Sequence, residues 1–202
     1  MTERLYAGLS AEQRSARRRE QFLTAGLATF AERGWSDTTV QDVCRAAALS
    51  PRYFYELFSS REDLFLAVTG RIAEQVQQTV RSALSAPAAD PRARAHAVLT
   101  ALAGYFTSDA RTVRVALVES LATEQLRVHR RELLESFHSL AARLMRALRE
   151  DPSRAARRRL EQSAAVLTGG VVELLIAWEG DPAGTPLLVD HLTDLYTAAA
   201  QL

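Results

Sequence analysis

Along most of the chain, apolar residues recur every three or four positions, which is the spacing of an amphipathic helix. Runs with the alternating pattern of a strand are almost absent, and glycine and proline fall mainly between the periodic segments. The pattern therefore predicts an all-α protein. Three N-terminal helices are expected first: one over about 12–33, a second from Thr38 or Thr39, and a short third helix from Pro51.

Local signals indicate where these helices begin and end. Gly34 is expected to end the first helix, because glycine readily adopts the left-handed conformation that follows a helix. Thr38 and Gln41 have the spacing of a capping box for the second helix. Ser50 before Pro51 is typical of a helix start, since the hydroxyl can accept a first-turn N–H and proline tolerates the first helical position.

The rest of the chain predicts a larger helical body. A fourth helix is expected from about residue 62 to residue 84, and a proline- and alanine-rich break follows it. Further helices are predicted at about 92–107, 110–122, 124–150, 153–179 and 185–201. We therefore predict two domains, a compact three-helix module over 1–62 and a larger helical domain over 63–202.

The short third helix has an unusual exposed face. Its sequence, PRYFYELF, places the phenylalanines and the leucine on one side of a helical wheel. Arg52, Tyr53 and Glu56 face the other way, with Tyr55 on the flank. Small residues at both ends of segment 44–48 allow the second and third helices to cross closely at a tight turn. This is the pattern of a helix-turn-helix, whose second helix enters the major groove of DNA.

Charge neither supports nor opposes this interpretation strongly. The net charge is +1, and residues 1–61 contain nine arginines against seven acidic residues. All 25 basic residues are arginine, which can form bidentate hydrogen bonds to phosphate or guanine. The run 17–19, Arg-Arg-Arg, is explained either by a solvated helix face or by contact with the DNA backbone.

Composition favours an ordinary soluble protein. Hydrophobic residues make up 48% of the 202 residues, enough for a real core. A single cysteine excludes an intramolecular disulfide, and no signal-peptide core or long uncharged apolar run is evident. We therefore expect a cytoplasmic protein with no membrane partner.

The region from Arg18 to Val68 closely resembles the tetracycline-repressor (TetR) family of transcriptional regulators. The segments that carry the resemblance are FLxA at 22–25, FAERGW at 30–35, TTVxDV at 38–43, AAALS at 46–50, FYxxF at 54–58 and SREDL at 60–64. The resemblance implies that Thr39 and Tyr55 bind phosphates and that Arg61 supplies a further charge contact. The DNA-binding set that follows from it, with Arg52 and Tyr53 as base readers, is Thr39, Gln41, Pro51, Arg52, Tyr53, Tyr55, Glu56 and Arg61.

Two departures from the family pattern leave alternatives open. Ala48 stands where the family often has glycine, and Leu57 stands where it often has histidine. The first hypothesis is a repressor that a small-molecule ligand releases from a palindromic operator. A second is a small-molecule binding protein with weakened DNA binding, and a third is a constitutive or activating DNA-binding protein.

The two final helices predict a homodimer. The helix at 153–179 is apolar on two faces, so both need to be buried, and the last helix repeats the pattern. We expect these helices to form a two-fold four-helix bundle with their copies, the arrangement that the family uses. The predicted interface residues are Ala165, Gly169, Val172, Ile176, Leu188, Leu192, Leu195 and Tyr196.

The resemblance also implies a ligand pocket enclosed by the remaining helices, largely apolar with few polar anchors. The alternative for the apolar candidates is ordinary core packing, and for Glu119 and His138 it is a solvated or structurally paired position. The candidates are Leu102, Tyr105, Phe106, Leu117, Glu119, Leu121, Phe137, His138, Leu140, Leu144 and Trp178.

No motif in the sequence predicts catalysis. The four histidines and Cys44 form no cluster with metal-ligand spacing, and Cys44 is expected to serve packing. No nucleophile–base pattern is evident. We therefore predict no enzyme activity, no metal and no cofactor.

Overall fold

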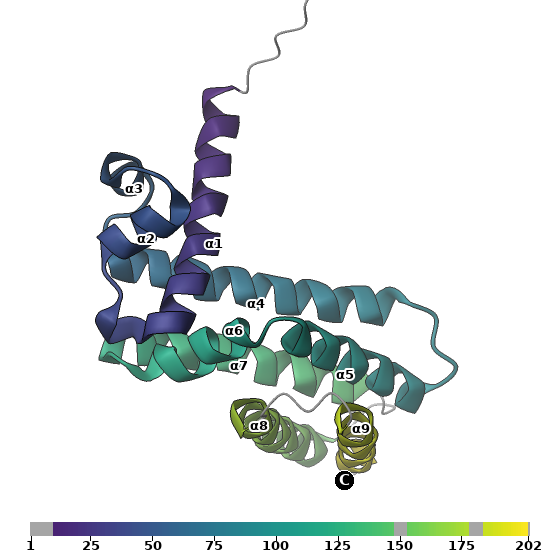
Figure 1. Cartoon of the computed structure of the whole chain (residues 1–202). Coiled ribbons are helices and arrows are strands. Elements are labelled where there is room, and N and C mark those ends of the chain that lie inside the picture. Colours follow the sequence, from purple (N-terminus) through teal and green to yellow (C-terminus); the bar gives the residue numbers. More distant parts are fainter. Residues whose placement is uncertain (1–9, 148–152, 178–183, 202) are drawn as a thin grey trace, which may run out of the picture. The chain divides into compact units, whose positions relative to one another are not determined.

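The computed structural model describes residues 10–147, 153–177 and 184–201, and these residues are helical with no strand (Figure 1). The all-α prediction is confirmed. The elements are α1 (Ala11–Asp37), α2 (Val40–Ala47), α3 (Pro51–Leu57), α4 (Arg61–Ser85), α5 (Pro91–Ser108), α6 (Ala110–Val113), the π-helix η1 (Arg114–Val118), the 3₁₀-helix η2 (Glu119–Leu121), α7 (Glu124–Ala147), α8 (Arg154–Ala177) and α9 (Thr185–Gln201).

The chain divides into two compact units within α4, one ending at Thr69 and the other beginning at Gly70. The first unit holds α1, α2, α3 and the start of α4, and the second holds the larger helical body. The N-terminal helix-turn-helix and the C-terminal helical body therefore follow the predicted order. The predicted domain boundary after residue 62 remains a prediction.

Aromatic side chains form the core of the first unit. The ring of Phe22 on α1 lies 5.5 Å from that of Phe54 and 6.2 Å from that of Phe58, edge to face in both cases. Further along α1, Phe30 lies 5.0 Å from Phe65 of α4. These rings are almost completely buried. Because aromatic side chains bury large areas, they hold α1, α3 and the start of α4 on one small core.

The end of α1 corrects one prediction. Regular helix geometry breaks at Gly34, which has a φ of 77°, as expected. Thr38, however, does not cap α2: it is buried at the end of α1, where its hydroxyl donates to the carbonyl of Gly34 at 2.7 Å. The capping box predicted for Thr38 and Gln41 is therefore wrong, and Thr39 with Asp42 forms it instead.

The start of α3 agrees only in part with the prediction. Pro51 occupies the first turn, as expected, but the Ser50 side chain makes no capping hydrogen bond. The Ser50 carbonyl accepts the N–H groups of Tyr53 and Phe54 at 3.1 and 3.3 Å. The helix therefore begins on backbone hydrogen bonds and the preset φ of proline.

Ala48, in the turn between α2 and α3, adopts the left-handed conformation, with φ 52° and ψ 38°. Its N–H donates to the Arg45 carbonyl at 3.2 Å, and the next N–H, of Leu49, donates to Cys44 at 3.1 Å. These bonds satisfy the carbonyls at the end of α2. The side chain of an L-residue makes this conformation costly, as the departure from glycine at this position predicts.

Ala48→Gly is expected to stabilise the protein. Relief of the left-handed strain should raise the free energy of unfolding by about 1 kcal/mol and the melting temperature by about 2–4 °C. Thermal unfolding followed by circular dichroism measures the change. Ala46→Gly is the matched control, because Ala46 is exposed, as Ala48 is, but lies within α2, so glycine there should destabilise by about 1 kcal/mol. A lower melting temperature for Ala48→Gly would contradict the prediction.

In the second unit, α7 packs against α8, and α5 packs against α9. The green α8 and the yellow α9 lie next to each other and share contacts (Figure 1). Met145 of α7 and Leu160 of α8 are completely buried in one apolar cluster. A second cluster joins Leu99 of α5 to Val189 and Leu192 of α9.

The helix predicted over 110–122 is not a continuous α-helix. It consists of a short α-helix, a π-helix over 114–118 and a 3₁₀ turn over 119–121. The Ser120 hydroxyl donates to the Ala116 carbonyl at 2.6 Å and so competes with the regular backbone ladder. A π turn takes more residues than an α turn, so the side chains after it point in a different direction.

One described helix, α8, is long and apolar enough to cross a membrane by length and composition alone, through a window of 18 residues. This is weak evidence for a membrane span, because core and interface helices of soluble proteins have the same composition. Only 17% of that window is buried within the protomer. Much of this apolar helix is therefore left uncovered by the described chain.

Candidate nucleic-acid interface

The outer face of α3 presents the side chains that the sequence predicts. Arg52, Tyr53 and Glu56 are exposed, and Tyr55 is 60% exposed on the flank. Phe54, on the opposite face, is completely buried in the aromatic core. A rigid anchor on one side and a charged, phenolic surface on the other suit a helix that enters a groove.

Arg52 and Glu56 form an ion pair across one turn of α3, with 3.2 Å between Nε and Oε1. Both side chains are well exposed, so the pair contributes only about 0.3–0.5 kcal/mol to stability. The carboxylate nevertheless draws the guanidinium along the helix surface. Glu56 also opposes binding at phosphates, because two negative charges repel.

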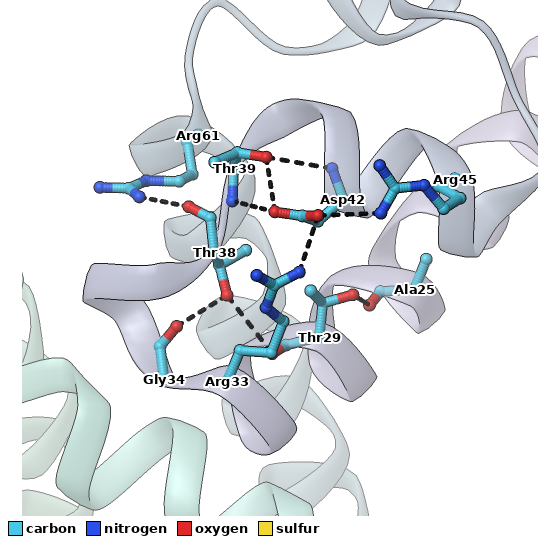
Figure 2. Close-up of polar contacts among 9 residues, drawn as sticks. All are labelled: Ala25, Thr29, Arg33, Gly34, Thr38, Thr39, Asp42, Arg45 and Arg61. Carbon is cyan, nitrogen blue, oxygen red and sulfur yellow. Dashed lines mark hydrogen bonds and ion pairs between the residues drawn. The ribbon is translucent and has the colours of Figure 1, made fainter.

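A network of polar side chains forms where α2 begins (Figure 2). The Thr39 backbone N–H and hydroxyl both donate to Oδ2 of Asp42, at 3.0 and 2.5 Å, and the Asp42 N–H donates back to the hydroxyl oxygen at 3.2 Å. The other carboxylate oxygen of Asp42 binds Arg33 at 2.7 Å and Arg45 at 3.1 Å. The network thus ties α1 to α2 and presents two arginines beside the helix-turn-helix.

This network changes the role expected for Thr39. The sequence predicts that its hydroxyl binds a phosphate, yet in the structure the hydroxyl donates to Asp42. A phosphate only accepts hydrogen bonds, so the Thr39 hydroxyl would have to turn away from Asp42 to reach one. Thr39 is the N-cap of α2 in the free protein, and phosphate binding stays a prediction.

The hydrogen bonds from Thr39 and the charge of Arg33 lower the pKa of Asp42 to about 2, from an ordinary value of 3.8. Because the folded-state pKa is the lower one, the stability from Asp42 is complete above about pH 4 and is lost as the pH falls towards 2. The free energy of unfolding of Asp42→Asn should therefore be lower than that of wild type at pH 5. The two values should converge near pH 2, as acid-unfolding curves would show. Asp37→Asn, which removes an exposed carboxylate outside this network, should follow wild type. Parallel curves for Asp42→Asn and wild type down to pH 2 would contradict this prediction.

Arg61 is held at the start of α4. Its guanidinium lies 4.1 Å from the centre of the Trp35 ring and donates to the Thr38 carbonyl. The side chain is half-buried, so it both braces the turn between α1 and α2 and places a positive charge beside Thr39. The predicted charge contact with DNA would use the donors that face outward from this stack.

Residues 22–68 match the sequence model described as bacterial regulatory proteins, tetR family. The match covers α2, α3 and the adjoining parts of α1 and α4, which are the elements that form the geometry above. The N-terminal region of the chain is therefore of the type found in TetR-family transcriptional regulators.

A curated relative of the chain is also named as a transcriptional regulator. The HTH-type transcriptional activator FasR from Mycolicibacterium smegmatis is 30% identical over 107 residues, which are 53% of this chain and 48% of that protein. The chain therefore spans about half the length of this curated relative.

Solved structures share the TetR fold over nearly the whole chain. A TetR-family regulatory protein from Rhodococcus RHA1 has a TM-score of 0.70 at 15% identity, covering 91% of this chain and 97% of the other. The regulator FadR from Bacillus subtilis, in complex with stearoyl-CoA, has a TM-score of 0.66 at 14% identity, covering 89% and 98%. The fatty acid degradation regulator FadR from Bacillus halodurans has a TM-score of 0.68 at 17% identity, covering 89% and 94%. At these identities the likeness concerns the fold alone.

The predicted dimer interface is only partly at the surface of the protomer. Gly169 and Ile176 on α8 and Leu195 on α9 are exposed. Val172 and Leu192 are instead buried in the protomer's own core clusters, and their place in a dimer interface stays a prediction. The remaining interface candidates, which are half-buried, are Ala165, Leu188 and Tyr196.

The ligand candidates differ in how deeply their side chains are buried. Leu117 is buried with Phe106 packed against its cluster, whereas Leu121 is 45% exposed, and its role in ligand binding stays a prediction. Because Leu121 follows the π-helix, its direction differs from that of a continuous α-helix. Glu119 forms an ion pair with Arg114 at 3.4 Å. The half-buried candidates are Leu102, Tyr105, Phe137, His138, Leu140 and Leu144, and Trp178 lies outside the described residues.

Tyr105 is the ligand candidate with the clearest polar environment. Its hydroxyl donates to Oε1 of Gln75 on α4 at 3.0 Å, and burial raises its pKa to about 12. Its ring also contacts Phe106 edge to face at 5.1 Å. The phenol is thus neutral at physiological pH, and its proton is held by Gln75.

Several functional contacts were not evident from the sequence. The spacing of Thr39 and Asp42 could have indicated the correct capping box, but nothing in the sequence pairs Asp42 with Arg33 on another helix. Cys44 is buried as predicted, and burial raises the pKa of its thiol, which keeps it protonated.

Proposed function

We propose that this protein is a homodimeric, cytoplasmic TetR-family repressor that binds a palindromic DNA operator and leaves it when a small molecule binds its helical body. The observation that carries the proposal is the outer face of α3. Arg52, Tyr53 and Glu56 are exposed there, while Phe54 fixes the helix to a buried aromatic core. Such a helix presents base-reading side chains without needing to fold on binding.

The uncovered apolar surface of the second unit supports the dimer. Val166 on α8 is 73% exposed and Leu187 on α9 is 76% exposed. Neighbouring exposed apolar residues on these helices are Leu174, Ile176 and Leu195. Large exposed apolar surfaces mark association sites, and soluble homo-oligomers are usually two-fold symmetric. A two-fold dimer would place two copies of α3 roughly 34 Å apart, in register with a palindrome.

For the effector, we propose a long-chain acyl-CoA. The B. subtilis neighbour was solved with stearoyl-CoA, so a long-chain acyl-CoA is the first effector to test here. Tyr105, with Gln75 and the apolar Phe106 and Leu117 in the same unit, is the candidate polar anchor. The ligand would release DNA only if it favours a conformation in which the two copies of α3 are wrongly spaced.

An activator is the second candidate, because the curated relative FasR is named a transcriptional activator. DNA binding through α3 is common to both versions. They differ in what the bound protein does to RNA polymerase.

Selection of random duplex DNA with the purified protein, followed by sequencing, tests the core of the proposal. We expect an enriched palindrome with half-sites about one helical turn apart. Stearoyl-CoA is then titrated against the complex, with free stearate and free coenzyme A as controls. Transcription in vitro from a promoter carrying the palindrome distinguishes repression from activation. Failure to enrich any duplex at moderate salt would leave the alternative of a ligand-binding protein with weakened DNA binding.

A further inference from the structure

The run of arginines on α1 makes specific contacts with the recognition helix. The guanidinium carbon of Arg18 lies 4.5 Å from the centre of the Tyr53 ring. One residue later, the guanidinium of Arg19 lies 5.2 Å from the centre of the Phe58 ring. Each arginine therefore has its own aromatic partner, one within α3 and one at its C-terminal end.

The environment of Arg18 shows that the ring determines its position. Its Nε atom is buried and has no hydrogen-bond partner within the part of the chain that the structure describes. A guanidinium is weakly hydrated and stacks readily on an aromatic face, whereas an ammonium does not fit the same flat arrangement. Arg18 is thus placed by its stack on Tyr53.

Tyr53 needs such a contact more than its neighbours do. Phe54 and Phe58 are locked in the buried aromatic core, whereas Tyr53 is 38% exposed on the outer face of α3. An exposed tyrosine on a short helix samples several rotamers. A cation on one face of the ring restricts that choice, and Phe22, one turn after Arg18, anchors α1 in the same core.

We propose that Arg18 is a positioning residue for DNA recognition: its stack orients the Tyr53 phenol and so sets the base preference of the position that Tyr53 reads. The inference rests on the proposed function and adds a specificity role for α1. Arg18 acts through Tyr53, in contrast to a residue that only adds positive charge near phosphates.

The test compares Arg18→Ala, Arg18→Lys, Tyr53→Ala and Arg17→Ala in the full-length protein. Arg17 is the matched control, because it belongs to the same run, is exposed, and has the same charge. For each protein, random-duplex selection gives the base preference at every position, and titrations at several salt concentrations give the affinity. Thermal unfolding verifies that each variant is folded.

We expect Arg17→Ala to lower the affinity equally for all sequences and to reduce the salt dependence. Arg18→Ala should also broaden the base preference at one position in each half-site, with about a further fivefold loss of affinity for the preferred sequence. Arg18→Lys should restore the salt dependence but not the base preference. Tyr53→Ala should broaden the base preference at the same position. Adding Arg18→Ala to Tyr53→Ala should lower the affinity by no more than Arg17→Ala lowers it in the wild-type protein.

The inference is overturned if Arg18→Ala and Arg17→Ala give the same base preferences, or if Arg18→Lys restores the wild-type preference. Either result can be obtained only if the wild-type protein enriches a palindrome. Such a result would therefore contradict this inference but not the proposed function. Absence of any enriched duplex with the wild-type protein defeats the proposed function and this inference together. If Arg18→Ala does not fold, Arg18→Lys alone decides, since an unchanged preference then contradicts the proposal.

Discussion

Replacing Arg52 with alanine is expected to lower affinity for the selected palindrome at least roughly 30-fold while leaving the dimer and its melting temperature unchanged. A bidentate contact from arginine to a base contributes about 1–3 kcal/mol, and a dimer loses two such contacts. Arg52 is well suited to this role, because it is exposed and only a weak ion pair with Glu56 restrains it. Fluorescence anisotropy with a labelled duplex measures the change.

Two controls separate base reading from a general loss of charge. Arg52→Lys keeps the charge but not the planar pair of donors, so it should recover only the sequence-independent part of the affinity. Arg81→Ala removes the same charge from the other compact unit, where the guanidinium binds Gln78, and should have little effect. Unchanged affinity for Arg52→Ala, in a protein that is still dimeric, would refute the role of α3 as the recognition helix.

The second large effect is expected from Val166→Arg. Val166 is 73% exposed near the middle of α8, so an arginine there would cost little in the isolated protomer. Inside an apolar two-fold interface, however, it would bring two buried positive charges together. We expect the variant to be a folded monomer by light scattering. Its affinity for the palindrome should fall about 100-fold or more, because the second half-site no longer benefits from linkage.

The matched control for this experiment is Val128→Arg. It makes the same substitution at an apolar residue of α7 that is 42% exposed. We expect it to stay dimeric and to bind DNA normally. A dimeric Val166→Arg variant would show that this part of α8 lies outside the subunit interface, and the proposed four-helix bundle would have to be abandoned.

The sequence predicted α3 well because one periodicity determines both of its faces. Phenylalanines recur at helical spacing on one side, so Arg52 and Tyr53 had to lie on the other. The left-handed conformation of Ala48 could be predicted for a similar reason, since a tight turn between two helices commonly needs a left-handed residue. These predictions concern local geometry, which depends on neighbours in the sequence.

Predictions that depended on contacts between distant segments were less successful. Because α8 is apolar on more than one side, its sequence could not show that Val172 packs inside the protomer while Val166 is exposed. The direction of Leu121 depends on the π-helix before it, and no residue in that segment forecasts the extra residue per turn. The Arg33–Asp42 pair joins two helices across a turn, which helical spacing cannot reveal.

The arginine–aromatic stacks have a consequence for regulation of the chain in a cell. The guanidinium groups of Arg18, Arg19 and Arg61 lie against rings of the first unit, and the chain contains no lysine at all. Lysine acetylation, a common way to neutralise a DNA-binding surface, therefore has no side chain to act on here. Arginine methylation would leave every positive charge in place but would block donors and crowd the stacked faces. A cell could thus alter how selectively this surface reads DNA without changing its net charge.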